Sequence, residues 1–384
     1  MELLRAASWM TDERTALADM ALKFARAEAE ANLEDWRRQQ RIDRDFFRKA
    51  GKLGLLSCAV PAEYGGGGGS SLDDFTVLRA FVRAGISPAP FQIQSNVVPH
   101  YIVHYGSEDQ RQRWLPGLAS GELIGSLGMT EAGAGSDVAA IGTRARREGD
   151  EYVISGSKIF ITNGAQADLV VLAVSTDPRV GRKGLSLIVV DTRDCAGFSV
   201  GRTLHKLGHH ESDTVELVFD EARVPAANLL GEEGDGFVML MRRLPLERMS
   251  LAVSALAAIE RSVELAIEHI NDRESFGRPL IEHQHVRFEI AECVTRARVA
   301  GAFLDSCVEQ LDRDELDNAT AAMAKLWLSE EENAITDKCL QLFGGYGYIT
   351  EYPIANYYSA ARVQRIYGGT NEMMKEIIGR AARL

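Results

Sequence analysis

Cysteine is scarce in this sequence, and the spacing of the cysteines gives no pairs. The 384 residues contain five cysteines, and no two of them form a C-x-x-C motif. Such a pattern offers neither a disulfide framework nor a thiolate metal site, and it suits a reducing compartment. We therefore expect a cytoplasmic protein without structural disulfides.

Long apolar runs and an excess of basic residues are also missing. No apolar stretch approaches the ~20 residues that cross a bilayer, and the N-terminus lacks the basic head, apolar middle and cleavage site of a secretory signal. Acidic residues outnumber basic ones by 55 to 43, which gives a net charge of -12. This balance argues against a general partner among nucleic acids or anionic membranes. We expect neither a membrane span nor a nucleic-acid partner.

Motifs for nucleotide and metal binding are absent as well. The glycine run 65–69 does not follow a strand and lacks the next glycine of a dinucleotide fingerprint, and no G-x-x-x-x-G-K-[ST] occurs. His100 and His104 lie four residues apart in an expected helix, but no H-E-x-x-H accompanies them. We expect these histidines to have a packing or surface role, and we expect no metal.

Helical periodicity marks the first part of the chain. With 46% hydrophobic and 26% charged residues, the chain has the composition of a globular protein large enough for two or three units. Residues 16–32, 73–84 and 108–118 show the helical period, and Asp43 is expected to cap a further helix that closes at Gly51 or Gly54.

The pattern changes near Gly121 to short apolar runs separated by Gly, Asn and Asp. Residues 151–154 and 158–162 resemble two strands of a hairpin around Ser-Gly-Ser, and strands are expected at 169–174, 185–190 and 214–219. Because no helices intervene, we expect a small barrel or sandwich rather than a parallel sheet.

The helical period returns after Gly231. Helices are expected at 236–272, 281–311, 315–342 and 372–383, and Pro245 is expected to kink the first of them. Helices of this length need partners, so a bundle is predicted. The sequence thus predicts an all-α domain at 1–118, a β domain at 119–229 and a helical bundle at 230–384.

Three segments carry the candidate chemistry. Residues 128–137, GMTEAGAGSD, form a Gly-rich turn that is either a cradle for a flavin edge or phosphate or a domain linker. In KIFITNG at 158–164, alternation places Phe160 and Thr162 on one face, where they either contact a flavin or belong to a half-buried strand with a core Phe. The third segment is the tail, with LFGGYGY and IYGGTNE.

In this order, the segments resemble the acyl-CoA dehydrogenase family over essentially the whole chain. TEAGAGSD, ITNG, RESFGRPL, LFGGYGY and IYGGTNE recur in that family in the same sequence order. The resemblance, which is greatest to the long-chain and isovaleryl types, implies a helical N-terminal domain, a middle β domain, a C-terminal four-helix bundle, FAD and usually a homotetramer.

The resemblance also implies site residues. Contacts to the flavin ring would come from Leu127, Gly128, Met129, Thr130, Phe160 and Thr162, and Ser136 would lie near the flavin phosphates and the CoA arm. The FAD pyrophosphate and adenosine would be held from a neighbouring subunit by Arg273, Phe276, Gln284, Gln341, Leu342, Gly344 and Gly345. Thr370 and Glu372 would close on the cofactor from the tail. Considered alone, Arg273 would be a surface cation at a helix end.

The catalytic base departs from the commonest family pattern. In many members a glutamate directly follows the tail tyrosine, but here that position is Gly368. Long-chain and isovaleryl-type members place the base on the helix that contains LPLER, so the resemblance assigns this role to Glu247. The alternative is that Glu247 pairs with an arginine on an exposed helix face. The backbone of Gly368 and Gly369, together with Arg248, would contact the substrate.

The sequence therefore predicts α,β-dehydrogenation of an acyl-CoA, with electrons passed to an electron-transfer flavoprotein. The alternatives are an oxidase that uses oxygen, a dehydrogenase of acyl groups on a carrier protein, and a non-catalytic FAD-binding subunit of a hetero-oligomer. The presence of Glu247 together with the FAD residues disfavours the last of these.

Overall fold

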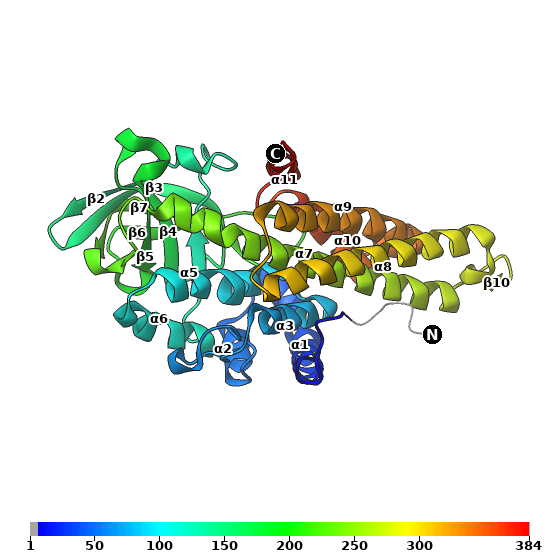
Figure 1. Cartoon of the computed structure of the whole chain (residues 1–384). Coiled ribbons are helices and arrows are strands. Elements are labelled where there is room, and N and C mark those ends of the chain that lie inside the picture. The colour runs from blue at the N-terminus through cyan, green and yellow to red at the C-terminus, as the bar shows by residue number, and fades with distance from the viewer. Residues whose placement is uncertain (1–6, 384) are drawn as a thin grey trace.

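Helices form the N-terminal part of the computed structural model, which describes residues 7–383 (Figure 1). They are α1 (Asp12–Gln39), α2 (Arg44–Lys52), α3 (Ser71–Arg83), α4 (Ala89–Phe91), a π-helix (Gln92–Val97), α5 (Val98–Tyr105) and α6 (Glu108–Ser120). Capping boxes begin α3 and α6, since Ser70 and Ser107 each bond reciprocally with the third helical residue. This domain encloses a core rich in phenylalanine.

Asp43 precedes α2, but the cap expected from its side chain is wrong. Its carboxylate accepts hydrogen bonds from Trp36 Nε1 at 3.1 Å and Gln39 Nε2 at 2.7 Å, and it makes no capping bond to α2. A buried indole N–H needs a partner, and Trp36 is 1% exposed. Asp43 therefore ties the end of α1 to the start of α2.

The middle domain is built from one eight-stranded sheet folded onto itself. Its strands are β1 (Gly125–Gly128), β2 (Arg144–Glu148), β3 (Glu151–Thr162), β4 (Leu169–Ser175), β5 (Leu185–Asp191), β6 (Phe198–Thr203), β7 (Thr214–Pro225) and β8 (Leu229–Leu230). The order is β6-β7-β3-β2-β4-β5-β8, with β1 beside β4. The single pair Arg144–Ser175 joins β2 to β4 and so divides the sheet into two halves. Side chains from β6, β7, β3 and β2 share one core with side chains from β4, β5 and β8. The expected sandwich-like β domain is confirmed.

The hairpin expected around residues 155–157 is wrong. These residues lie inside β3, which runs unbroken for 12 residues and pairs with β7. Gly156 lies at a register shift with φ 149°, and a Cβ there would lie 2.6 Å from Thr143 Oγ1. The Ser-Gly-Ser sequence therefore marks a β-bulge with a close approach rather than a turn.

The C-terminal domain is helical, as expected. It contains α7 (Gly236–Asp272), the short strands β9 (Glu274–Ser275) and β10 (Arg278–Pro279), α8 (Gln284–Asp312), α9 (Asn318–Leu342), α10 (Pro353–Ala361) and α11 (Asn371–Ala381). Helices α7 to α10 pack together, and α11 packs on α9. Helix α10, which starts at a proline, is not among the four helices expected from sequence in this domain. Pro245 lies inside α7, which continues through it.

Short 3₁₀ turns complete the described chain. They occupy Ala62–Tyr64, Val138–Ala140, Pro178–Gly184, Thr192–Asp194, Ala226–Asn228, Leu280–Glu282, Gly344–Tyr348 and Arg362–Arg365. No helix among residues 7–383 is long and apolar enough to cross a membrane.

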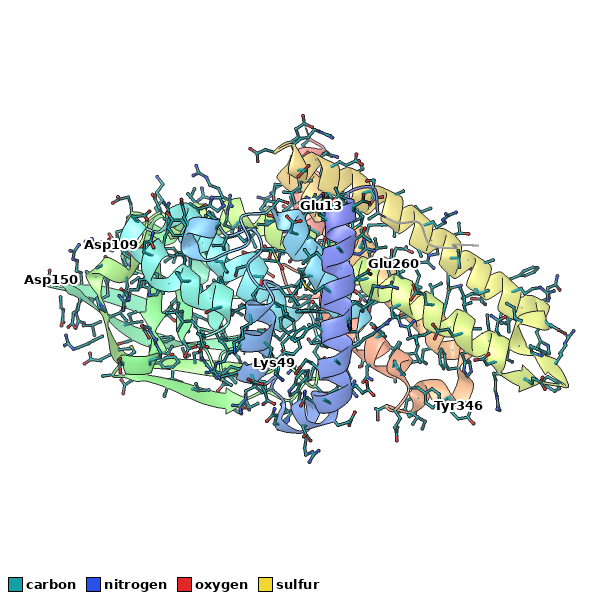
Figure 2. All side chains as sticks on the ribbon, turned by 90° about the horizontal axis from the view of Figure 1, so that it is seen from below. Glu13, Lys49, Asp109, Asp150, Glu260 and Tyr346 are labelled. Atoms are coloured by element: carbon teal, nitrogen blue, oxygen red, sulfur yellow. The ribbon has the colours of Figure 1, made fainter. Side chains whose placement is uncertain are left out.

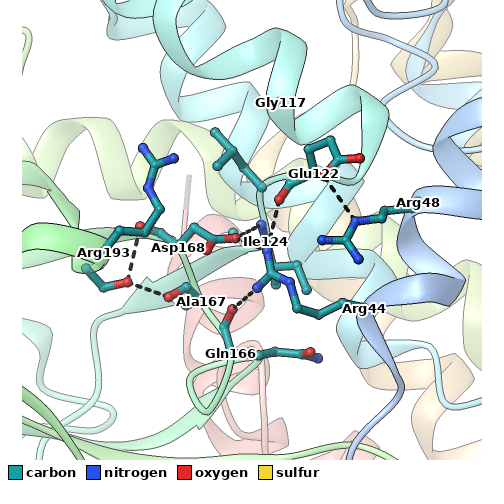
Figure 3. A network of polar contacts seen from close by, with 12 residues as sticks. Arg44, Arg48, Gly117, Glu122, Ile124, Gln166, Ala167, Asp168 and Arg193 are labelled. Atoms are coloured by element: carbon teal, nitrogen blue, oxygen red, sulfur yellow. Dashed lines mark hydrogen bonds and ion pairs between the residues drawn. The ribbon is translucent and has the colours of Figure 1, made fainter.

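A polar network joins the N-terminal and middle domains (Figure 3). Arg44 donates to the carbonyl oxygens of Gln166 at 2.8 Å and Glu122 at 2.9 Å, and to Asp168 Oδ2 at 2.5 Å. The same Asp168 oxygen accepts the backbone N–H of Ile124 at 2.8 Å. One arginine thus holds α2 against the loops that precede β1 and β4.

Helix α7 connects the β domain to the far end of the molecule, where β10 lies (Figure 1). Along its length it is joined to α3 by Arg79–Glu260 and Arg83–Glu264, each at 2.8 Å. Figure 2 shows Glu260 near the middle of the molecule, with Asp150 and Tyr346 towards opposite ends. The bundle therefore has one end at the β domain and another remote from it.

Candidate active site

The first cluster of candidate residues lies where the chain leaves β1 and runs along β3. The amide of Ile159 donates to Thr130 O at 2.9 Å. Lys158 Nζ donates to Met129 O at 3.2 Å and to Glu131 Oε1 at 2.7 Å. The structure thereby brings the segment 127–130 alongside 158–162, as the flavin hypothesis requires.

Phe160 projects from this edge. It is 64% exposed, so the alternative of a core phenylalanine is wrong. Its φ is 62°, at a register shift between Lys158 and Ile161, and a bulky residue in the left-handed region is a strained outlier. Thr162 is half-buried nearby, and its carbonyl accepts from Ser126 Oγ at 2.7 Å. The bulge presents an aromatic ring beside a hydroxyl on an accessible face.

A buried ion pair, which the sequence analysis missed, supports this edge. Lys158 has a fully buried side chain, and burial lowers its pKa to about 8. Burial also acts to raise the pKa of Glu131, but hydrogen bonds from Lys158, Thr143 and the Gly142 amide outweigh it and hold that pKa below its usual value. Both groups are therefore charged at neutral pH. The only signal in the sequence was a lysine inside an apolar strand.

The glycines of the Gly-rich turn fall into two kinds. A Cβ at Gly128 would lie 2.7 Å from Leu172 Cδ1, so packing inside the chain requires this glycine. At Gly133 and Gly135 a Cβ would meet nothing within 4 Å, and neither residue has positive φ. Ser136 is exposed beside them. No contact among the described residues explains these two glycines, and they leave room for a bound phosphate group, so this turn fits the cofactor.

The second cluster contains Glu247. This residue of α7 accepts a hydrogen bond from the hydroxyl of Tyr101 on α5 at 2.9 Å, so its partner is not the arginine of the alternative hypothesis. Burial raises the pKa of Glu247, while Tyr101 and then Arg248 and Arg243 oppose the rise. Tyr101 is 0% exposed. Tyr101 is not among the residues expected from sequence, where its only signal is a tyrosine within an apolar segment.

Gly368 lies against the face of α7 that carries Glu247. It has φ 65°, and a Cβ there would lie 2.2 Å from Leu251 Cδ1. Leu251 is one helical turn after Glu247 and so shares its face. Arg248, in contrast, is 4% exposed and donates to Asn318 Oδ1 at 2.6 Å, which ties α7 to the start of α9.

A buried lysine holds the tail loop in place. Lys325 Nζ on α9 donates to the carbonyl of Gly369 and to Asn371 Oδ1, both at 2.8 Å. Thr370 caps α11 through the amide of Met373. Glu372 lies exposed in the first turn of α11. The loop that presents Gly368 is therefore fixed from both sides.

The third cluster lies at the end of the bundle remote from the β domain. Arg273 follows the last residue of α7, and its guanidinium carbon lies 5.4 Å from the ring centroid of Tyr346. Phe276 is 96% exposed with φ 53°. The other members of this predicted group are also accessible, with Leu342 half-buried: Gln284, Gln341, Leu342, Gly344 and Gly345. The structure therefore keeps this cluster, at the β10 end of the bundle, away from β3, the strand that contains Phe160 (Figure 1).

Family comparisons agree with this arrangement. Models of the acyl-CoA dehydrogenase N-terminal, middle and C-terminal domains match residues 11–122, 126–222 and 234–383. The long-chain specific acyl-CoA dehydrogenase of Rattus norvegicus is 40% identical over 96% of this chain and 86% of its own length. The isobutyryl-CoA dehydrogenase of Dictyostelium discoideum is 35% identical over 97% of this chain and 89% of its own.

Solved structures show the same relationship. The acyl-CoA dehydrogenase of Geobacillus kaustophilus superimposes with a TM-score of 0.96 at 40% identity, covering 99% of this chain and 100% of that one. The butyryl-CoA dehydrogenase of Megasphaera elsdenii gives a TM-score of 0.93 at 30% identity, covering 98% and 99%. With three matching domain models and close relatives over nearly its full length, the chain belongs to the acyl-CoA dehydrogenase family.

Proposed function

We propose that this protein is an FAD-dependent acyl-CoA dehydrogenase in which Glu247 takes the α-proton of the acyl thioester. The observation that carries the proposal is the half-buried carboxylate of Glu247, which is bonded to Tyr101 and lies one helical turn before Leu251, the residue that Gly368 of the tail motif approaches. A raised pKa brings a carboxylate towards the working range of a general base, and burial raises the pKa of Glu247.

The residues around the base have complementary roles. The backbone N–H of Gly368 would donate to the thioester carbonyl and stabilise the negative charge that develops as the α-proton leaves. Gly369 would add to this contact, and Arg248 would keep α7 in position through Asn318. When bound, FAD supplies the acceptor for the hydride that leaves the β-carbon.

The two remaining clusters would hold the cofactor. The segment Leu127–Thr130 with Phe160 and Thr162 would contact the ring, Ser136 the phosphates, and Thr370 and Glu372 the cofactor from the tail. Burying the exposed ring of Phe160 against a flat cofactor would remove apolar surface from water. Electrons would then pass to an electron-transfer flavoprotein.

A visible spectrum tests the whole proposal. We expect purified protein to be yellow with about one FAD per chain, because the Gly-rich turn and the β3 bulge fit the cofactor. Adding acyl-CoAs of graded length under anaerobic conditions should bleach the flavin band. Folded protein that contains no flavin and takes none up would contradict the assignment.

Each FAD is proposed to be completed by two chains, in a homotetramer. Arg273 and Gly344 lie on exposed surface far from Phe160, so they can reach a cofactor only in a neighbouring subunit. We expect FAD affinity to fall as the protein dissociates on dilution, measured by sedimentation with absorbance in the flavin band. A monomer that retains full affinity for FAD would exclude the shared site.

Tyr101→Phe tests the environment of the base. The Tyr101 hydroxyl lowers the pKa of Glu247 against the larger effect of burial, so its removal should raise that pKa further. Because the base acts when deprotonated, the rise of kcat/KM with pH should move to higher pH in the variant. FAD content should not change. A pH–rate profile identical to that of the parent would show that Tyr101 has only a packing role.

A structural neighbour is consistent with the carrier-protein alternative. The prolyl acyl carrier protein oxidase AnaB superimposes with a TM-score of 0.89 at 25% identity. Offering the same acyl group on CoA and on a carrier protein, with and without oxygen, separates dehydrogenase, oxidase and carrier-protein activities. We expect the CoA thioester to be the better substrate.

A further inference from the structure

A cavity of about 260 Å³ lies where all three domains meet, away from the residues discussed above. It is bounded by α1, the turn between α3 and α4, the loop 209–211, α7, α9 and α10. Among its lining residues are Arg37, Ser87, His209, Ser254, Glu332 and Gln364.

The lining contains several polar atoms that have no partner. Within the described residues, Ser87 Oγ, Glu332 Oε2 and Gln364 Oε1 make no hydrogen bond, and each of these residues is 2% exposed. His209 Nε2 and Arg37 Nε on the same wall are also without hydrogen-bond partners. Burying such groups unpaired is costly. Several of them around one cavity indicate an occupant that offers hydrogen bonds.

The titratable groups of the inner wall are Glu332, His209 and the pair that Arg37 forms with the buried Glu211. Burial raises the pKa of Glu332 well above its usual value, which favours the protonated acid, a hydrogen-bond donor as well as an acceptor. Burial also lowers the pKa of His209 to about 4, so this imidazole is neutral. Arg37 is paired with the exposed Glu34 at 2.9 Å and with the buried Glu211 at 4.0 Å. These groups suit a neutral hydroxyl or carbonyl better than an ion.

One face of α7 connects this cavity to the proposed base. Glu247, Leu251, Ser254 and Ala258 follow each other at spacings of four, three and four residues, which places them on one stripe. Ser254 and Ala258 line the cavity. At ~1.5 Å per residue, they lie about 10 and 16 Å along the axis from Glu247. The stripe therefore leads from the base towards the cavity, and a long acyl chain that follows it would pass Leu251 and Ser254.

The part of α7 that precedes Glu247 suits the CoA end of the substrate. Arg243 lies one turn before Glu247, on the side away from the cavity. Arginines attract phosphate groups, and CoA carries several. The CoA arm is thereby directed away from the cavity and the acyl tail towards it.

We propose that this protein prefers long acyl thioesters that carry a hydroxyl or keto group on the distal part of the chain, which the cavity binds by hydrogen bonds. This inference rests on the proposed function. Ser254 and Gln364, already bonded to each other at 3.3 Å, form the inner wall of that site. Ser87 and Glu332 are its unpaired partners.

The test compares dodecanoyl-CoA with ω-hydroxydodecanoyl-CoA, using butanoyl-CoA as a chain too short to reach the cavity. We expect kcat/KM to be roughly tenfold higher for the hydroxylated substrate, as for one well-placed buried hydrogen bond. Equal or better use of the plain chain would overturn the inference and indicate a cavity that holds only water. If none of the three reduces the flavin, the proposed function itself fails.

Two variants locate the effect. Glu332→Leu and Ser87→Ala should abolish the preference for the hydroxylated chain without changing kcat/KM for butanoyl-CoA. Glu332→Leu removes an unpaired buried carboxyl, so we expect it to fold at least as stably as the parent. Ser262→Ala is the matched control, because Ser262 Oγ is also buried without a partner but is not among the cavity residues. A preference that survives Glu332→Leu would overturn the assignment of the site.

Discussion

Glu247→Gln is expected to bind FAD and acyl-CoA normally but to bleach its flavin ~10²–10⁴-fold more slowly than the parent, the usual contribution of a positioned general base. The amide keeps the shape of the side chain and can still accept the hydrogen bond that Tyr101 donates at 2.9 Å. It cannot take a proton at neutral pH, and no hydride can leave while the α-proton stays. Anaerobic stopped-flow reduction by acyl-CoA measures the effect directly.

A control for this variant is available on the same helix. Glu264→Gln alters a carboxylate that pairs with Arg83 at 2.8 Å, far along α7 from the stripe at Gly368. We expect it to leave the rate of flavin reduction unchanged. If Glu247→Gln reduces its flavin as fast as Glu264→Gln, then Glu247 is a structural residue and the base lies elsewhere.

The structure also changes the design of a rescue experiment. From sequence, Gly368→Glu in the Glu247→Gln background should restore part of the rate. However, Gly368 has φ 65°, and a Cβ there would lie 2.2 Å from Leu251 Cδ1. A glutamate would be strained and would displace Leu251. We therefore expect measurable rescue only when Leu251→Ala is added, and incomplete rescue even then, since a 1 Å misplacement can cost ~10²-fold.

Lys158→Met is expected to destabilise the protein by ~3–5 kcal/mol, the cost of breaking a buried ion pair from one side. The variant leaves Glu131 ionised at 12% side-chain exposure without its cation. It also releases the carbonyl of Met129, so the segment proposed to contact the flavin ring loses one of its attachments to β3. Both the temperature at which the middle domain unfolds and the FAD content of the purified protein should fall.

Two further variants distinguish the effect of breaking the Lys158–Glu131 ion pair from the effect of losing a basic side chain. Lys158→Met combined with Glu131→Gln should recover much of the stability, because no uncompensated buried charge remains. Arg202→Met removes one member of an exposed pair with Glu216 and should change little. If Lys158→Met unfolds at the same temperature as Arg202→Met, the buried pair does not hold the segment.

Local sequence patterns were sufficient to predict those features that depend on residues close together in the chain. The helical period predicted the long helices of the C-terminal domain, and the family motifs predicted the order of the three domains. The same reasoning failed at Ser155–Ser157, where a turn-forming sequence is a bulge, and at Asp43, whose carboxylate binds Trp36. At residues 155–157, pairing with the distant strand β7 outweighed the local propensity, and at Asp43 hydrogen bonds from Trp36 and Gln39 of the preceding helix did so.

The sequence alone determined the domain order and the family of this protein, because periodicity and short motifs are properties of contiguous residues. Only the tertiary structure decided which groups meet. Tyr101 and Glu247 lie 146 positions apart and become partners because α5 packs on α7. The hydrogen-bonding cavity likewise exists only where six segments converge and leave buried polar atoms unpaired, which no local pattern can encode.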